Sequence, residues 1–195
     1  MVFLVIFFPQ NTGTISPFEI IVYSLFWRIP ACILILLLLD KKPVFRLKKD
    51  FFVLAAAFGA LCLAGILVSL AAAITGFLPP AEIQAPSGIT GWTAAILFSL
   101  CIGFLEEIYF RIYLVQKIIE INPEQTRFSI ASAYFISSLI FALCHFYEGP
   151  WGIINALLAA LVLSAAYHKS SSFFGIAAAH GLYNVFVFLS ARGAS

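Results

Sequence analysis

Long apolar runs alternate with short polar breaks along almost the whole chain. The runs lack the period-2 alternation of half-buried strands, so they are typical of helices rather than of a barrel. Most of them approach the ~20 residues that a helix needs to cross the hydrocarbon core. A helix also pairs its backbone groups internally, as lipid requires. We predict six spans: Pro17–Leu39, Phe51–Leu78, Trp92–Gln116, Phe128–Phe146, Trp151–Tyr167 and Phe173–Ala191.

The breaks between these runs are rich in Pro, Gly, Asn and Ser, which are typical of turns. None is long enough to separate two domains, and no internal repeat is visible. We therefore predict one all-α domain over residues 1–195, a polytopic transmembrane bundle with a membrane-embedded polar cavity. Residues 1–8 form a shorter apolar run that Pro9 ends, with no preceding positive charge and no cleavage site. We expect this run to lie in the interface or to belong to a longer helix, not to be a signal peptide.

Composition agrees with a membrane protein. The chain is 63% hydrophobic and 10% charged, whereas a soluble domain is about half apolar and about a quarter charged. The net charge of +2 and the absence of a basic run interleaved with aromatics give no indication of a nucleic-acid partner. The cysteines lack the close spacing of a zinc or redox motif, so we expect small buried apolar side chains. They are Cys32, Cys62, Cys101 and Cys144.

Basic residues occur only in alternate loops, which predicts the orientation of the chain. Short cytoplasmic loops carry an excess of Lys and Arg. The first, third and fifth breaks are basic, whereas the second and fourth hold neither residue. The basic loop residues are Lys41, Lys42, Arg46, Lys48, Lys49, Lys117, Arg127 and Lys169. We predict that these loops are cytoplasmic and that both termini face the outside.

Ionisable residues inside a span cost about 2.5–3.5 kcal/mol each on insertion scales, so they mark a candidate site. The third span holds Glu106, Glu107 and Arg111. Glu107 and Arg111 are four residues apart and share one helix face, which predicts an ion pair. Glu106 points ~100° away and has no cation on its own helix face. Tyr109 and Tyr113 share that face and are expected to approach Glu106.

Two later spans add further polar groups. His145 ends the motif FALCH in the fourth span, and His180 and Asn184 lie four apart in HGLYN of the sixth. Taken singly, each is more often a hydrogen-bonded structural residue than a catalyst. Taken together, they supply a base, groups that orient it and donors to an oxyanion. The fourth span also holds serines that either line a wet entrance or pack helices, namely Ser129, Ser132, Ser137 and Ser138.

Three motifs carry a family resemblance. EEIYFR, FALCH and HGLYN match EExxxR, FxxxH and HxxxN in that order, within residues 92–191. The set resembles the CAAX-processing and bacteriocin-processing (CPBP, or Abi) family of intramembrane endopeptidases, which includes the type II CAAX prenyl proteases. The resemblance implies that Glu106 and His145 activate a water and that His180 and Asn184 stabilise the oxyanion. It also implies that Glu107 and Arg111 brace the site.

Metal dependence is left as two alternatives. A glutamate-activated water without metal is the account now favoured for the family, which was first described as metalloproteases. Glu106, His145 and His180 are acceptable zinc ligands, but the HExxH motif is absent. We favour the reading without a cofactor and keep zinc as the alternative.

The predicted function is that of an intramembrane endopeptidase that cleaves a membrane-associated peptide or protein. The small chain is typical of prokaryotic members, so we expect a multi-pass protein of a prokaryotic cell membrane. Peptide maturation, bacteriocin self-immunity and removal of sorting signals are all open as its role, and the oligomeric state is open too. The alternatives are a non-catalytic immunity or scaffold protein of the same fold and, ranked lower for want of repeated halves, a proton-linked carrier.

The depths of the motif residues do not match if every run is a straight span. From the cytoplasmic ends, Glu106 lies ~15 Å deep, His180 ~11 Å and His145 ~26 Å at 1.5 Å per residue. We therefore expect the fourth helix to be tilted, or the turn after it to be sunk in the protein. Glu148 in that turn is expected to be an ordinary loop carboxylate, with an approach to the site as the alternative. Arg28, two residues before Pro30, pairs with Glu106 or Glu107 or reaches the interface.

Overall fold

Helices make up the structure of the chain. The computed structural model describes residues 17–39, 42–76, 88–121 and 126–192; the segment 1–16 and Lys41 lie outside them. Its elements are α2 (Pro17–Leu38), α3 (Leu47–Thr75), α4 (Gly88–Glu107), the π-helix η1 (Ile108–Tyr113), α5 (Leu114–Ile121), α6 (Arg127–Leu143), the 3₁₀-helix η2 (Phe146–Glu148), α7 (Gly149–Ser170) and α8 (Phe173–Arg192). No strand occurs among these described ranges, so the predicted all-α fold is confirmed.

The chain divides into two compact units, Met1–Lys42 and Pro43–Ser195. The first unit contains α2, which has Pro30 inside it. Arg28 lies two residues before that proline, and its predicted pairing with an acid of the third span stays a prediction. The second unit contains α3 to α8 and all three motifs, so the site belongs to this unit.

Four described helical segments are long and apolar enough to cross a membrane. They are Leu47–Thr75, Gly88–Ile121, Phe146–Ser170 and Phe173–Ser190. The predicted fourth span, Phe128–Phe146, needs correction, because α6 has only 17 residues and ends at Leu143. Four of the predicted spans thus meet this length among the described residues, and the polytopic all-helical character is confirmed.

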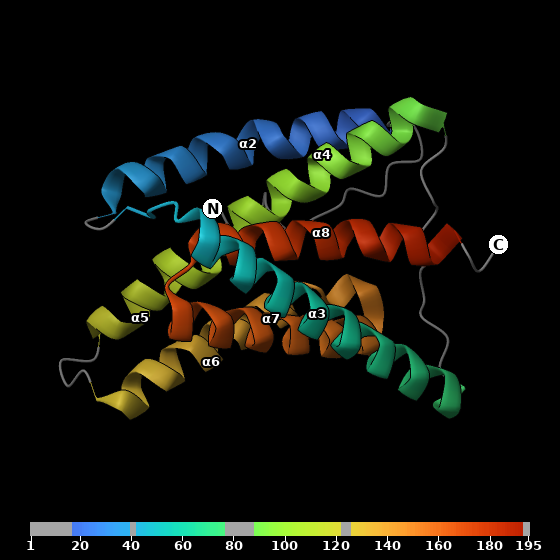
Figure 1. Ribbon diagram of the computed structural model, residues 1–195. Coiled ribbons are helices and arrows are strands. Elements are labelled where there is room, and N and C mark those ends of the chain that lie inside the picture. Colours follow the sequence, from blue (N-terminus) through green and yellow to red (C-terminus); the bar gives the residue numbers. More distant parts are fainter. Residues whose placement is uncertain (1–16, 40–41, 77–87, 122–125, 193–195) are drawn as a thin grey trace. The chain divides into compact units, whose positions relative to one another are not determined.

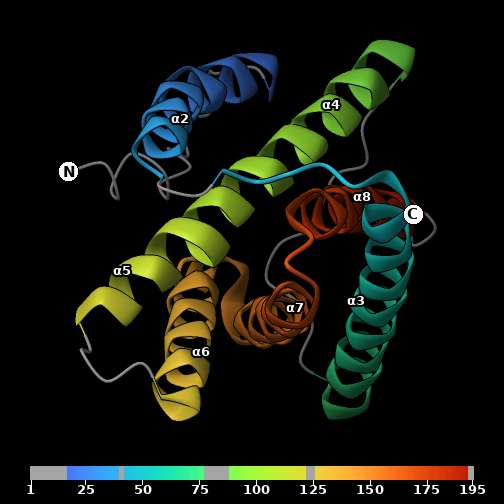
Figure 2. The same cartoon turned by 60° about the vertical axis from the view of Figure 1, so that its left-hand side comes forward.

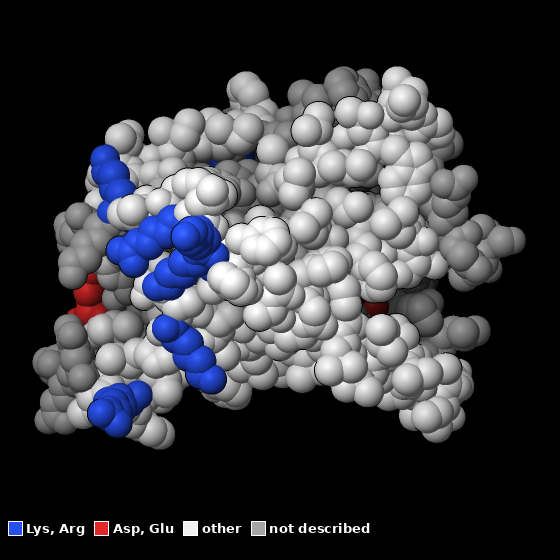
Figure 3. Space-filling view, in the orientation of Figure 1, with Lys and Arg blue, Asp and Glu red and all other residues white. Residues whose placement is uncertain are grey.

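The second unit has one basic end. Figure 1 shows that α3, α6 and α8 begin there and that α5 and α7 end there. Lys and Arg side chains gather at this end in Figure 3. The basic residues of these helix ends are Arg46, Lys48, Lys49, Lys117, Arg127 and Lys169. The described helix ends beside the loops predicted to be cytoplasmic thus lie at one end of the second unit, while the cytoplasmic location of that end stays a prediction.

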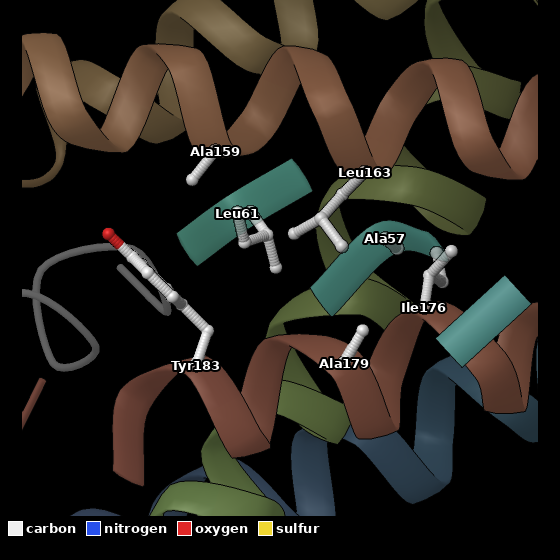
Figure 4. Packing of buried hydrophobic residues seen from close by; sticks show 7 residues of the cluster. All are labelled: Ala57, Leu61, Ala159, Leu163, Ile176, Ala179 and Tyr183. Carbon is white, nitrogen blue, oxygen red and sulfur yellow. The ribbon is translucent and has the colours of Figure 1, made fainter. Parts of the chain in front are cut away.

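The helices of the second unit pack in a ring. Going around it, α4 packs on α8, α8 on α3, α3 on α7, and α7 on α6, which returns to η1 and α5 (Figure 2). The side chains joining α3, α7 and α8 are shown in Figure 4. They are Ala57, Leu61, Ala159, Leu163, Ile176, Ala179 and Tyr183. Small residues recur among them because helices in lipid gain stability by close van der Waals packing.

Two glycines bring α4 and α8 together beside the motifs. A Cβ on Gly103 would lie 2.6 Å from the backbone nitrogen of Gly181. A Cβ on Gly181 would lie 2.8 Å from the Cα of Leu100. Any larger residue at either position would push the helices apart. Since Gly181 follows His180, this close approach sets His180 against the end of α4.

A buried acid fixes the basic end of the unit. Asp50 accepts hydrogen bonds from the Ser172 hydroxyl in the α7–α8 turn and from the backbone N–H of Arg46. It lies in the first turn of α3, where the helix dipole favours negative charge. Both partners satisfy the carboxylate, so Asp50 is a structural acid that joins α3 to the α7–α8 turn.

Candidate active site

The centre of the site is an ion pair without solvent contact. Glu107 ends α4 and is 0% exposed, and Arg111 in η1 is 1% exposed. The Arg111 Nε lies 3.2 Å from the Glu107 Oε2, so the predicted pair is confirmed. The guanidinium also lies 5.0 Å from the ring centroid of Phe141, a cation–π contact. The charge of Arg111 is thereby matched by groups from α4 and α6.

His180 is held by the other oxygen of the same carboxylate. Its Nδ1 lies 2.9 Å from the Glu107 Oε1. Because an ionised carboxylate only accepts hydrogen bonds, Nδ1 carries the proton and donates it. The bond fixes the direction of the ring, as carboxylate partners do for functional histidines. Glu107 therefore braces Arg111 on one side and His180 on the other.

Glu106 occupies a different environment from its neighbour. Its side chain is 12% exposed, and its Oε2 lies 3.7 Å from the Nε2 of His180. That separation is too long for a direct hydrogen bond. The predicted division of the two acids thus holds, with Glu107 engaged in the ion pair and Glu106 facing a ring nitrogen across a gap.

Phe141 brings the second histidine to this place. The ring of His145 lies 4.5 Å from that of Phe141, and the His180 ring lies 5.8 Å from it. The Nδ1 of His145 is 2.9 Å from the Phe141 carbonyl oxygen, which can only accept, so Nδ1 donates. The Nε2 is left free of this bond. Both histidines and Arg111 thus surround one aromatic ring, that of the Phe in the FxxxH motif.

The depth of His145 follows from the shortness of α6. The helix starts at the basic end and stops after 17 residues, so the turn that follows it falls short of the far ends of α3 and α8 (Figure 1). The turn is therefore deeper than a full span would place it, but the protein does not enclose it, because Phe146 and Tyr147 are exposed. His145 reaches the level of His180 because its helix does not cross the whole bundle.

Asn184 is not drawn into this network. It lies one turn after His180 on α8 and is half-buried. Among the described residues it makes no hydrogen bond or ion pair. Tyr109 and Tyr113 contact each other with ring centroids 5.8 Å apart, and their predicted approach to Glu106 stays a prediction.

A π-helical turn shapes the EExxxR motif, and sequence reasoning missed it. The backbone N–H of Leu114 bonds to the Tyr109 carbonyl, five residues back. A π-turn shifts the carbonyls out of the α-helical register, and such turns are frequent at functional sites. The Phe110 carbonyl accepts instead from the hydroxyl of Ser137 in α6, which is 0% exposed. Ser137 therefore packs helices and supports η1, which settles the two alternatives for this serine.

Replacing Ser137 by Ala should loosen this turn. The free energy of unfolding should fall by about 1–3 kcal/mol, because a buried carbonyl loses its donor. Amide exchange of Leu114 should also accelerate, which hydrogen exchange with mass spectrometry would measure. Ser132→Ala is the matched control, since Ser132 is half-buried on the same helix without a hydrogen bond to a described residue. Equal behaviour of the two variants would contradict the role given to Ser137.

The candidate zinc ligands do not form a complete set in this geometry. Among the described residues, no three His, Cys, Asp or Glu side chains converge closely enough to hold a metal ion. Glu106 and His180 approach each other, but His145 does not join them as a third ligand. We therefore derive no step through a metal.

Fold and site together define a polytopic membrane protein with a buried acid–arginine–histidine network between its helices. A family model described as type II CAAX prenyl endopeptidase Rce1-like matches residues 88–186, just over half of the chain. The chain belongs to this family, and the resemblance drawn from the three motifs is confirmed. Searches of curated proteins and of solved structures give no match. Members of the family are generally proteases.

Proposed function

We propose that the protein is an intramembrane endopeptidase in which Glu106 and His145 activate a water. The observation that carries the proposal is the contrast between the two adjacent acids. Glu107 is fully buried and bonded to Arg111 and His180, whereas Glu106 is partly exposed and stands 3.7 Å from the His180 Nε2. A gap of this length between polar groups is suited to a bridging water. One acid is thus committed to structure and the other is available for proton transfer.

The proposed reaction is the hydrolysis of a peptide bond. Glu106 takes a proton from the water and passes it to the His145 Nε2, while the oxygen of the water forms a bond to the carbonyl carbon of the substrate. The His180 ring, protonated at both nitrogens with its Nδ1–H held by Glu107, donates its Nε2–H to the oxyanion that develops on the carbonyl oxygen, and the Asn184 amide donates a second hydrogen bond. The carbon–nitrogen bond then breaks, and the proton passes to the departing amine. The products are a carboxylic acid and an amine, which balances the water consumed.

The membrane setting supports a substrate that is itself lipid-associated. Many side chains on the outer faces of α3 and α4 are apolar and exposed, which is the character of a lipid-facing surface; they include Phe52, Leu63, Leu67, Ile74 and Leu97. We propose that the basic end faces the cytoplasm of a prokaryotic cell, on the positive-inside rule. The substrate would then be a peptide or protein that enters the ring of helices from the bilayer.

Peptide cleavage by the purified full chain tests the proposal. The probes are a fluorescence-quenched transmembrane peptide library and a farnesylated CAAX peptide, each in proteoliposomes with and without 1,10-phenanthroline. We expect cleavage of at least one probe and no effect of the chelator. Cleavage that the chelator removes and zinc restores would overturn the reading without a metal. Failure to cleave either probe, or solute flux without cleavage, would overturn the peptidase.

A further inference from the structure

The turn between α6 and α7 places a third carboxylate beside His145. The backbone N–H of Glu148 bonds to the His145 carbonyl at 3.0 Å, which closes the 3₁₀ turn η2. Side chains three residues apart eclipse each other in a 3₁₀ turn. Glu148 and His145 therefore project from the same side of the turn. The charge of Glu148 is within electrostatic reach of both His145 and Glu106.

The backbone after Glu148 directs this carboxylate inward. Gly149 has φ +77°, a conformation that other residues adopt only with strain. A Cβ on Gly152 would contact the Glu148 side chain and lie 3.0 Å from its Oε2. The carboxylate thus lies over the first turn of α7, and the half-buried Glu148 makes no cap hydrogen bond there. The two glycines leave the space that this conformation needs.

The groups that interact with Glu148 come from several elements of the second unit. They are His145, Glu106, the adjacent Tyr147, which bonds to it, and Tyr183 of α8. The Tyr183 hydroxyl itself donates to the Asn155 Oδ1 of α7 at 2.9 Å. None of the described lysines or arginines is among the groups whose charge reaches Glu148.

A half-buried carboxylate without a lysine or arginine is costly in a membrane protein. Asp50 avoids that cost through two strong donors, one from Ser172 and one from the backbone. Glu148 has a different arrangement, because its chief ionisable neighbour is the imidazole proposed to accept a proton. Its place therefore suits a role in the reaction better than a role in folding.

We propose that Glu148 is a positioning residue for His145, and this inference rests on the proposed peptidase function. When the His145 Nε2 takes the proton from water, the ring becomes an imidazolium, and the Glu148 carboxylate stabilises that charge. The Phe141 carbonyl meanwhile keeps the Nδ1 proton in place. Glu148 neither takes the proton nor touches the substrate. Buried carboxylates next to catalytic histidines act in this way in serine proteases.

The kinetic test compares Glu148→Gln with Glu148→Asp. We expect Glu148→Gln to lower kcat by about 10- to 100-fold with KM changed by less than about twofold, because only the charged intermediate loses support. Glu148→Asp should recover most of the loss. Glu120→Gln is the matched control, because Glu120 lies at the basic end in a solvent-exposed pair with Lys117. A wild-type kcat for Glu148→Gln would overturn the proposal and leave the peptidase standing.

A second pair of variants leaves Glu148 in the chain, and one of the two displaces its carboxylate. Gly152→Ala puts a methyl group against the Glu148 carboxylate, whereas Gly59→Ala adds one where no atom lies within 4 Å. We expect a loss of kcat in the first variant and none in the second. If Glu148→Gln does not fold, this pair decides the matter, and equal kcat values overturn the proposal.

A spectroscopic measurement separates this inference from the peptidase function. The chain has three histidines, so their ¹⁵N ring signals can be assigned by single replacements in detergent micelles. Glu148→Gln should shift the signals of His145 and leave those of His168 unchanged. Unchanged His145 signals would overturn the proposal. Shifted signals in a protein that cleaves no probe would support the contact between Glu148 and His145, while the peptidase proposal itself would fail.

Discussion

Replacing Glu106 by Gln should abolish peptide cleavage, with kcat reduced by about 10³-fold or more and the fold retained. Gln has the shape of Glu but cannot take a proton from the water. Glu106 is also outside the Glu107–Arg111 pair, and the His180 Nε2 stands 3.7 Å from its Oε2. The substitution should therefore change chemistry and leave packing unaltered. Initial rates on the probe that the wild-type protein cleaves, together with thermal unfolding followed by circular dichroism, measure both effects.

Glu120→Gln serves as the control for loss of a carboxylate elsewhere in the same helical segment, and it should cleave at the wild-type rate. More than about a tenth of wild-type kcat in Glu106→Gln would show that this carboxylate is not the proton acceptor, since a lost general base costs at least 10²-fold. Unchanged cellular activity of the variant would instead favour the immunity or scaffold protein. These two outcomes are distinguishable, because only the first requires measurable hydrolysis.

The pairing of Glu107 with Arg111 was predictable because it depends on one helix alone. A spacing of four residues places two side chains on one face whatever surrounds them. Membrane insertion could be predicted from composition and run length for a similar reason, since the bilayer sets the required length. Both inferences use local geometry, and neither needs to know which helix packs on which.

The remaining features of the site depend on contacts between distant segments. The π-turn at Ile108–Tyr113 is supported by Ser137 from α6, which no periodicity in the third span signals. The apolar run around His145 continues past Leu143, so its pattern predicted a full span where the helix actually stops. The excess apolar length is the Cys144–Tyr147 turn, which the protein interior surrounds in part. The mismatch in depth was the signal that this helix was too short.

The same reasoning explains why Glu148 was expected to be a loop carboxylate. Glycine and proline beside it are typical of an exposed turn. In the structure, Gly149 and Gly152 instead make room for the Glu148 side chain to fold back over α7. Turn residues specify that the chain reverses but not how deep the reversal lies. Only the length of α6 and the packing of Phe141 determine that depth.

The second large effect is expected for Arg111→Met, which should lower the free energy of unfolding by about 3–5 kcal/mol. The substitution leaves Glu107 buried, with its Oε2 facing no cation. Replacing both partners in Glu107→Leu/Arg111→Met should restore most of the stability, because neither buried charge is then left alone. Lys117→Met at the exposed pair with Glu120 should change stability little, since both side chains are about half-exposed. Unfolding in mixed micelles, followed by circular dichroism, would measure the free energies.

The double variant separates the two roles of Glu107, which are to pair with Arg111 and to orient His180. It removes the Oε1 that orients the His180 ring at 2.9 Å, so we expect it to be folded but nearly inactive. A double-mutant cycle on stability should show strong coupling between positions 107 and 111. Additive losses would contradict the ion pair as the source of stability. Restored cleavage in the double variant would contradict the role of Glu107 in holding His180. It would also contradict our explanation of the two adjacent acids in the motif, in which Glu107 orients His180 and Glu106 acts on the water.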